Sequence, residues 1–587
     1  MSTLAQKTRS ALTWQDIVFL IASIVSIVLL SVTVWNNKIP KAEEESVPLQ
    51  QREWGGLIIG NASSELYSTQ RLNQYLDTVF FDLSMCNMDI QDMEHLVQRL
   101  INTCVVEELI LNLSICDVEK SREDKMWYPH SLKRMVDATS ALTLYGEDLF
   151  IPPWYAAMSK ENDIFQKGMG SQEQLARDVE NIGTLRDYLN KEKYVCFAAA
   201  QQQKRDLTGM EEYLSGVRNI KQLCEQSGVN LTVVCTPVYA QQLERYFQSD
   251  VAAFYRQLAE ITDYWDFSKS PLSFDPRYFY DEVRPRSSVG EMMLARIFGD
   301  TGVYVPPNFG MYVTKDTVDE LQWLHWASEL SEESTYTAQL PILMYHHVSS
   351  EDGVGDTIGA ERFASHMEAL CAQGYTSISF QDAKKYVETG TDLPDKPVLI
   401  TFDDGYESNL TLAAPILEKY GMEATVFAVG VSINKGTYKE TGKQMLPHFA
   451  LEDAIGIPAI EVQSHGYDLH EVRGLDPEPV RRGALQRENE SREEYIRFLE
   501  DDCERMKKLF LAAYGRQPEV LAYPYGLYSE ISEQVISEHG VYATVTTRSG
   551  SNVITKGLPQ SLRAMNRYTV RGEMTAAELL SLLEKNV

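Results

Sequence analysis

Two neighbouring carboxylates and two histidines are the residues in this sequence whose types and spacing could do chemistry. Asp403 and Asp404 end the apolar run PVLITF within the motif TFDDGY, and His465 and His470 lie further along in SHGYDLH. One carboxylate with two imidazoles is a common ligand set for a catalytic divalent metal ion, which leaves the other carboxylate to act as a base. Together the four residues predict a metal-dependent active site.

The aspartate pair can serve one site only if the strand before it has ended. Neighbouring side chains of a strand point to opposite faces of the sheet, so Asp403 and Asp404 would otherwise diverge. Gly405 follows directly and indicates that the chain turns there. On its own, Asp-Asp-Gly is more typical of a turn that caps the next helix. The apolar run before it and the histidines after it favour the metal site.

The two histidines are five residues apart, which does not place them on one face of a helix. We therefore expect His465 and His470 on an irregular loop after the strand AIEVQS, with Asp468 as a candidate to orient an imidazole. A single histidine would more often be structural. Two nitrogens and one carboxylate suit one divalent ion, for which we expect zinc, with nickel, cobalt or iron as alternatives.

Two further clusters offer polar groups near predicted strand ends. The run Tyr345-His346-His347 supplies another imidazole, although a histidine there could also be satisfied inside a core. The YPYG turn, Tyr523 to Gly526, follows a strand, and its backbone N–H groups are candidates to bind an oxyanion. Ordinary loop chemistry is the alternative interpretation of that turn.

The elements that must position these residues form an α/β unit that opens at Pro341. Helical patterns lie between most of its strand-like runs; the clearest spans 492–514, with Ser491 and Glu494 as a capping box and Gly515 as its stop. The alternation predicts a (β/α) barrel, in which the chemistry sits at the carboxyl ends of the strands. The predicted strands are ILMYHHV, TSISF, VLITFDD, ATVFAVG, AIEVQSH, VLAYPYG and YATVTT.

An earlier α/β unit runs from about Leu57 to Val313. Its strand-like runs GLIIG, TVFFDLS, EELILNLS and NLTVVCTP alternate with helical segments such as 90–103 and 209–227. This pattern predicts a layered domain with a mostly parallel sheet. Residues 314–339 are a predicted linker with one short helix.

The N-terminus and the charge constrain location and partners. Ile17–Trp35 is uncharged and long enough to cross a bilayer as a helix. We expect an uncleaved anchor with the N-terminus in the cytoplasm and the rest of the chain outside; a cleaved signal peptide and a buried core helix are the alternatives. The formal charge of −30 disfavours nucleic acid as a partner and fits a neutral or cationic polymer better.

The motifs TFDDGY, SH-x-x-x-x-H and YPYG resemble those of the NodB-type polysaccharide deacetylases, carbohydrate esterase family 4. The likeness covers roughly residues 340–572 and is nearest to the subgroup that de-N-acetylates poly-β-1,6-N-acetylglucosamine in biofilms. That subgroup has the longer histidine spacing and carries its Tyr-His motif at the start of the domain. The resemblance implies a deformed (β/α) barrel of NodB type.

The resemblance also implies a role for each matching residue. Asp403 matches the catalytic base, and Tyr525 the residue whose backbone N–H stabilises the oxyanion. His346 matches the general acid, although His347 stands where the family has an acidic neighbour. Ala522 and Tyr523 stand where the family's usual arginine is found, so Arg567, in MNRYTV, is the candidate to pair with Asp403. The metal ligands of the family match Asp404, His465 and His470.

The earlier unit weakly resembles SGNH-type hydrolases and acyltransferases over about residues 55–305. Its opening block GLIIGNASSELYS has Ala62 where that family has the serine nucleophile, although Ser63 or Ser64 could substitute. Its closing block YDEVRPRSSVG has Arg284 where the family has the histidine base. We therefore expect a three-layer α/β domain without hydrolase activity; an active O-acetyl esterase or transferase is the alternative.

These expectations combine into one organisation. Residues 1–36 form a cytoplasmic tail and transmembrane anchor, 37–55 a linker, 56–313 the SGNH-like domain, 314–339 a second linker and 340–587 the deacetylase domain. The expected function is metal-dependent de-N-acetylation of an extracellular N-acetylglucosamine polysaccharide. A peptidoglycan or chitin-type deacetylase and a non-catalytic polysaccharide-binding membrane scaffold are the alternatives. The expected partners are the N-acetylated polysaccharide, the membrane, and proteins of exopolysaccharide synthesis or export.

Overall fold

The computed structural model describes the chain in two lobes, an N-terminal lobe within 53–320 and a C-terminal lobe within 336–584. The predicted anchor at Ile17–Trp35 and most of the predicted linker helix lie outside the described residues. None of the helices that are described combines the length and the apolar character needed to cross a membrane. The described residues are 53–60, 66–84, 88–103, 105–118, 177–190, 204–320, 336–439, 441 and 443–584.

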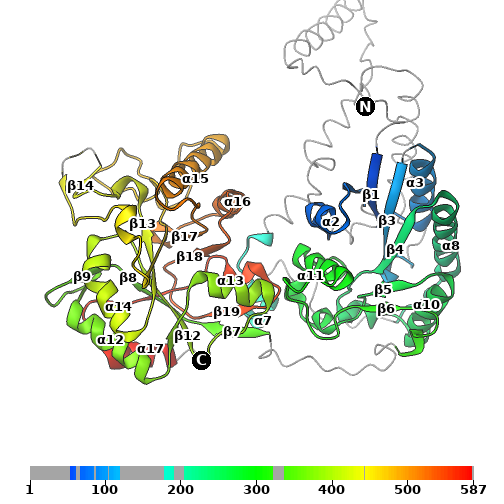
Figure 1. Ribbon diagram of the computed structural model, residues 1–587, viewed down its shortest axis with the longest axis horizontal. Helices are drawn as coiled ribbons and strands as arrows, with labels where there is room; N and C mark the ends of the chain where they lie inside the picture. Colours follow the sequence, from blue (N-terminus) through cyan, green and yellow to red (C-terminus); the bar gives the residue numbers. More distant parts are fainter. Residues whose placement is uncertain are drawn as a thin grey trace, which may run out of the picture. The chain divides into compact units, whose positions relative to one another are not determined.

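The described part of the N-terminal lobe is built on a six-stranded sheet in the order β2-β1-β3-β4-β5-β6 (Figure 1). All neighbouring strands are parallel except β5 and β6, so the expected mostly parallel sheet is confirmed. The strands are β1 (Glu53–Ile59), β2 (Phe80–Asp82), β3 (Val105–Leu113), β4 (Asn230–Cys235), β5 (Tyr264–Asp266) and β6 (Met311–Val313).

Helices cover both faces of this sheet because its strands are apolar on both sides. On β1, Leu57 and Ile59 pack into the core with α3, α8 and α10, whereas Ile58 between them packs with α2, α7 and α11. The lobe therefore has three layers. The helices are α2 (Thr69–Leu76), α3 (Ile90–Thr103), α7 (Leu185–Asn190), α8 (Met210–Ser227), α9 (Ala240–Leu243), α10 (Gln248–Ile261) and α11 (Ser287–Phe298).

The C-terminal lobe contains a parallel sheet in the order β18-β17-β16-β13-β12-β8-β20, with β11 beside β12 (Figure 1). The gap between its two end strands is crossed by an irregular segment: Met565 bridges to Val545 of β18, and the Arg567 N–H donates to the carbonyl of Arg548 (2.8 Å). The sheet is thus a deformed barrel. Its strands are β8 (Ile342–Tyr345), β11 (Thr376–Ser377), β12 (Pro397–Phe402), β13 (Ala424–Ala428), β16 (Ile460–Ser464), β17 (Val520–Ala522), β18 (Ala543–Val545) and β20 (Tyr568–Thr569).

Among the described residues of this lobe, six α-helices and three short strand pairs complete the structure. The strand pairs are β7 (Thr337–Leu340) with β19 (Asn552–Thr555), β9 (His347–Ser349) with β10 (Thr357–Gly359), and β14 (Thr437–Tyr438) with β15 (Lys443–Gln444). The helices are α12 (Ala360–Ala372), α13 (Phe380–Thr389), α14 (Ala414–Tyr420), α15 (Arg492–Tyr514), α16 (Glu530–Glu538) and α17 (Ala576–Glu584).

The central strand β12 lies between two of the hydrophobic cores of this lobe. Ile400 and Phe402 pack outward with α12 and α14, whereas Leu399 packs with Phe427 and α13 on the inner side. Because side chains alternate along a strand, Thr401 and then Asp403 continue the inner side. The strand thereby directs Asp403 into the barrel.

Local sequence signals explain why one predicted helix is confirmed and why one predicted strand is wrong. Helix α15 has the predicted bounds, and Ser491 and Glu494 form the predicted capping box. The predicted strand TSISF is wrong beyond Ser377, because Ser379 and Asp382 form a capping box that begins α13. This polar cap outweighs the strand preference of Ile378 and Phe380.

The contact between α3 and α8 yields a test of the packing. A Cβ on Gly216 would lie 2.5 Å from Cγ1 of Ile90, so Gly216→Ala should lower the free energy of unfolding by about 1–3 kcal/mol. Gly436→Ala is the control, because no atom lies within 4 Å of its added Cβ. Denaturant unfolding of both variants checks the expectation, and equal stabilities would contradict the tight α3–α8 contact.

Candidate active site

The turn after β12 brings two adjacent aspartates to one site. The Asp403 N–H still donates to the carbonyl of Tyr345 (2.9 Å), so Asp403 retains the strand's inward direction. Asp404 then has φ +74° and Gly405 has φ +81°, both in the left-handed region. This conformation is costly for a residue with a Cβ, although Asp tolerates it better than most. It redirects the Asp404 carboxylate toward the histidines.

Asp404, His465 and His470 converge as the sequence predicts. One ligand atom from each lies within 4.8 Å of the others. The Nε2 atoms of His465 and His470 are 3.7 Å and 3.6 Å from the same oxygen, Oδ1 of Asp404. Two imidazole nitrogens and a carboxylate oxygen facing one space are the donor set of a mononuclear divalent site. The three residues therefore fit a metal ion.

The other polar atom of each ligand is held by a neighbour. His465 Nδ1 lies 2.7 Å from the carbonyl of Ala522, which selects the tautomer that leaves Nε2 free to bind a metal. The Tyr406 hydroxyl donates to Oδ2 of Asp404 (2.9 Å) and leaves Oδ1 to the histidines. These contacts fix the orientation of the ligands.

The third ligand, His470, is held by the side chain of Tyr525. The Tyr525 hydroxyl donates to the carbonyl of Glu471 (2.8 Å) and lies 3.3 Å from Nδ1 of His470. The two rings also pack with centroids 4.6 Å apart. Tyr525 itself has φ +59° within the turn Pro524–Gly526. The sequence suggested only a backbone role for Tyr525, so its contact with a metal ligand is an addition.

Burial and charge set the ionisation of the ligands. Burial alone would raise the pKa of Asp404, but the charges of His470 and His465 outweigh it and lower that pKa below its ordinary value. Burial lowers the pKa of His465 to about 4, despite the opposing charges of Asp403 and Asp404. At neutral pH Asp404 is therefore ionised and His465 neutral, which are the forms that bind a metal.

Asp403 is paired with Arg567 inside the barrel. The guanidinium donates from NH1 to Oδ1 of Asp403 (2.6 Å) and from NH2 to Oδ2 (2.7 Å), and both side chains are almost fully buried. Arg567 also donates to the carbonyl of Thr546 (2.8 Å). Burial would raise the pKa of Asp403, yet the Arg567 charge and His465 hold it well below its ordinary range. The sequence-based pairing of these two residues is thus present in the structure.

His346 lies beside the aspartates, and His347 does not assist it. The charge of His346 lowers the pKa of both Asp403 and Asp404, which places it near them. Its buried Nδ1 has no hydrogen-bond partner within the described part of the chain. Nδ1 of His347 instead lies 2.8 Å from the Ser408 hydroxyl. His347 stands where an acidic neighbour of His346 was expected. Its side chain contacts Ser408, which directly precedes the π-helix Asn409–Ala413.

The loop that carries the histidines is anchored by α15. Both oxygens of Asp502 accept backbone N–H groups of the loop, from Tyr467 (2.8 Å) and Asp468 (2.7 Å). The carboxylate of Asp468 forms an ion pair with Lys439 (2.7 Å). Nδ1 of His465 and Nδ1 of His470 contact the Ala522 carbonyl and the Tyr525 hydroxyl instead, so the interpretation that Asp468 orients an imidazole is wrong. Asp502 carried no local sequence signal, because it looks like any acidic residue of a long helix.

The closing block of the N-terminal lobe, residues 280–290, contains no histidine to act as the base. Arg284 donates from Nε to Oδ2 of Asp281 (2.6 Å), and its backbone N–H donates to Oδ1 of the same residue (2.8 Å). A guanidinium stays protonated and cannot accept a proton. Ala62, Ser63 and Ser64 of the opening block lie outside the described residues. The SGNH likeness therefore stays a prediction.

The chain is similar to known polysaccharide deacetylases. A family model described as polysaccharide deacetylase matches residues 390–544. YxkH of Bacillus subtilis, a candidate polysaccharide deacetylase, is 30% identical over 249 residues, which are 42% of this chain and 77% of YxkH. The poly-β-1,6-N-acetyl-D-glucosamine N-deacetylase of Staphylococcus epidermidis is 24% identical over 220 residues, covering 34% of this chain and 69% of that protein.

A solved structure also aligns with part of the chain. A de-N-acetylase from Aggregatibacter actinomycetemcomitans is 21% identical, with a TM-score of 0.37, over 42% of this chain and 100% of that one. A score this low adds nothing to the fold described above.

The buried pair yields a test of stability. Arg567→Met should lower the free energy of unfolding by about 3–5 kcal/mol, because it leaves Asp403 buried without a countercharge. Arg571→Met is the matched control: Arg571 pairs with Asp356 at the surface (2.7 Å), where such a pair contributes at most about 1 kcal/mol. Denaturant unfolding measures both, and equal losses would show that the Asp403 pair is not the buried contact described.

The ligand set yields a test of metal binding. His465→Ala should abolish stoichiometric binding of zinc, since one of three protein ligands is lost. His539→Ala is the control, because His539 caps α16 and contacts the carbonyl of Val535 (2.8 Å) instead. Metal content after dialysis checks this, and one bound ion per chain in the His465→Ala variant would exclude His465 as a ligand.

Proposed function

The chain belongs to the polysaccharide deacetylase family, and from that premise we propose that it removes acetyl groups from an N-acetylglucosamine-containing polysaccharide. The observation that carries this proposal is the convergence of the metal-binding set Asp404, His465 and His470 with the buried pair of Asp403 and Arg567. A metal site beside an ionised carboxylate suits hydrolysis of an amide. The family assignment makes that amide an acetamide on a sugar.

In the proposed reaction a divalent ion would be held by Asp404, His465 and His470. Such an ion supplies Lewis acidity, which polarises a carbonyl oxygen and acidifies water. We assign zinc, with nickel, cobalt and iron as alternatives, because two imidazoles and a carboxylate suit all four.

The other residues of the site handle protons and charge. Asp403, kept ionised by Arg567, accepts a proton from the water that attacks the acetamide carbon. The backbone N–H of Tyr525 donates to the oxyanion that forms. His346 gives a proton to the amine nitrogen as the carbon–nitrogen bond breaks. The products are acetate and a primary amine on the sugar.

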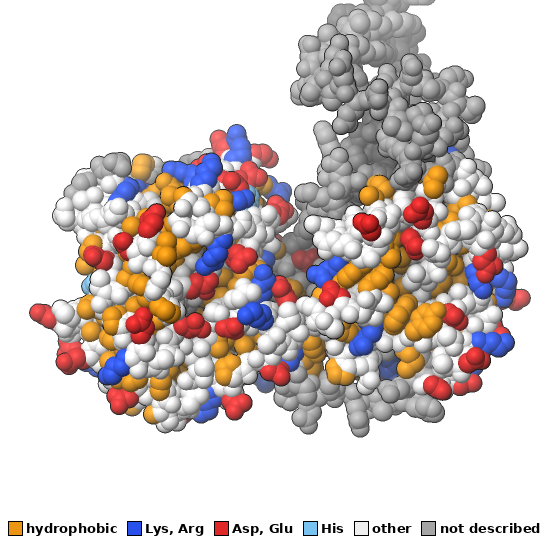
Figure 2. All heavy atoms as spheres, viewed as in Figure 1, with side chains coloured by type: hydrophobic (Ala, Val, Ile, Leu, Met, Phe, Trp, Pro, Cys, Tyr) orange, Lys and Arg blue, Asp and Glu red, His pale blue; other side chains and the backbone are white. Residues whose placement is uncertain are grey.

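Poly-β-1,6-N-acetylglucosamine is the proposed polymer. Support comes from the five-residue spacing of His465 and His470 and from the named activity of the Staphylococcus epidermidis relative. On the face shown in Figure 2, Lys and Arg are interspersed with Asp and Glu, which gives no support to a nucleic-acid partner. A peptidoglycan or chitin-type substrate would be distinguished by acetate release from defined oligosaccharides.

We also propose a location outside the cytoplasm, with Ile17–Trp35 as the membrane anchor. The uncharged stretch of the sequence supports this, since it has the length of a membrane span. The N-terminal lobe is proposed to be a degenerate SGNH-like domain, supported by Arg284 at the position of the base. Proteins of exopolysaccharide synthesis or export are its proposed partners.

The base assignment is tested by Asp403→Asn. This variant should retain metal but lose at least about 100-fold in acetate release, because an amide cannot accept the proton. Asp395→Asn removes an exposed carboxylate before the same strand and serves as the control. Acetate is measured with N-acetylglucosamine oligomers and metal by elemental analysis. Near-normal turnover by Asp403→Asn would refute the role, and no turnover by the unmodified chain on any oligomer would favour a non-catalytic scaffold.

A further inference from the structure

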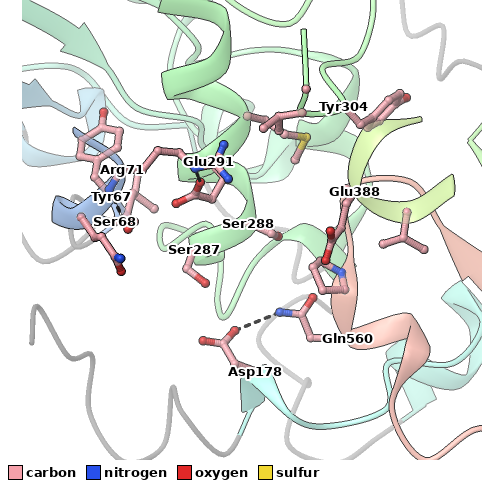
Figure 3. Close-up of a pocket in the computed structure, with 18 of the residues that line it drawn as sticks. Tyr67, Ser68, Arg71, Asp178, Ser287, Ser288, Glu291, Tyr304, Glu388 and Gln560 are labelled. Atoms are coloured by element: carbon pink, nitrogen blue, oxygen red, sulfur yellow. Dashed lines mark hydrogen bonds and ion pairs between the residues drawn. The ribbon is translucent and has the colours of Figure 1, made fainter. Parts of the chain in front are cut away.

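A cavity of about 930 Å³ lies apart from the metal ligands. It is lined by the first turns of α2 and α11 in the N-terminal lobe and by the end of α13 and residues Gly557–Gln560 in the C-terminal lobe (Figure 3). Small-molecule sites typically measure about 300–1,000 Å³, so this cavity is at the upper end of that range. It has room for a ligand of more than one sugar ring.

The cavity lies at the end of the barrel opposite the metal ligands. Helix α13 ends at Thr389, shortly before β12 begins at Pro397, so its last turn lies near the amino end of the strand. The Gly557 N–H donates to the carbonyl of Val387 in that turn (2.6 Å). Asp403 and Asp404 instead follow the carboxyl end of β12. The cavity is therefore a separate site.

Three residues that line this cavity have an oxygen acceptor without a hydrogen-bond partner among the described residues. Gln560 is only 4% exposed; its Nε2 donates to Oδ1 of Asp178 (3.1 Å), but its Oε1 has no partner among the described residues. The hydroxyl of Ser288 also has no hydrogen-bond partner among the described residues. No ion pair or hydrogen bond within the described part of the chain involves the Glu388 carboxylate. Figure 3 shows Glu388, Gln560 and Ser288 among the residues that line the cavity.

The other carboxylates of the cavity have cations beside them. Glu291 forms an ion pair with Arg71, and Asp178 lies 3.7 Å from NH1 of Arg286. Glu388 has no ion pair of this kind; burial raises the pKa of its carboxyl, and the nearby charges of Lys384 and Arg71 only partly oppose that rise. An ammonium group has one positive charge and three N–H donors, so it complements a carboxylate, an amide oxygen and a hydroxyl. Acetylation of the amine would remove both the charge and two of the donors.

We propose that this cavity binds a de-N-acetylated stretch of polysaccharide, with a glucosamine ammonium group between Glu388, Gln560 and Ser288. The inference rests on the proposed function, which generates such amines. Hydroxyl and amide side chains on the remaining wall suit sugar hydroxyls, and the net charge of −30 attracts a cationic polymer. The chain would thus hold its product at a distance from the site that forms it. The hydroxyl and amide side chains of the remaining wall belong to Ser68, Gln70, Gln74, Ser287 and Tyr304.

Binding of two matched ligands to the full chain tests the proposal. The probes are a β-1,6-linked glucosamine tetramer and its fully N-acetylated counterpart, with affinities measured by titration calorimetry. We expect tighter binding of the free amine. Glu388→Gln should weaken it about tenfold or more and Ser288→Ala about threefold. Glu368→Gln, which removes an exposed carboxylate from α12, should leave the affinity unchanged.

The opposing outcomes separate this site from the proposed activity. Equal affinity for the two tetramers, or an unchanged affinity in the Glu388→Gln variant, would overturn the site even if acetate is released. Competition by spermidine at the tetramer's own concentrations would indicate a simple amine site and would also overturn it. If no acetate is released but Glu388→Gln still weakens binding of the glucosamine tetramer, the activity fails and the site stands.

Discussion

The arrangement of the site depends on the alternation of side chains along a strand. Asp403 keeps the inward direction of β12 and meets Arg567 inside the barrel. Asp404 would face away, but its left-handed backbone turns its carboxylate toward the two histidines. One strained residue thus lets neighbouring carboxylates take different tasks within one site. The parallel sheet then brings the histidine loop after β16 and the turn after β17 to the same edge.

The fold was predictable where local signals agreed with the tertiary structure. Helix α15 has an apolar stripe, a capping box at Ser491 and a glycine stop at Gly515, and all three act in the folded chain. The segment TSISF has strand-forming residues, but its cap at Ser379 begins a helix. The irregular closure of the barrel through Met565 could not be predicted, because it depends on bridges between segments without strand periodicity.

The site was predictable to the extent that its residues lie in compact motifs. Asp404, His465 and His470 converge as their spacing indicated. The residues that hold them were missed because their contacts are tertiary. Asp502 reaches the histidine loop from the middle of α15, and Tyr406 bonds to Asp404 across the turn. Tyr525 was identified for its backbone, yet its side chain also supports His470.

The closure of the barrel by the segment around Arg567 has a consequence for the order of assembly. Ribosomes extend a chain from its N-terminus, and Arg567 is the last of the site residues to be added. A growing chain therefore holds both aspartates and both histidines before it holds the cation that neutralises Asp403. Until then a carboxylate destined for the interior has no countercharge, which opposes its burial. Charge neutralisation in the site thereby depends on the segment that closes the barrel.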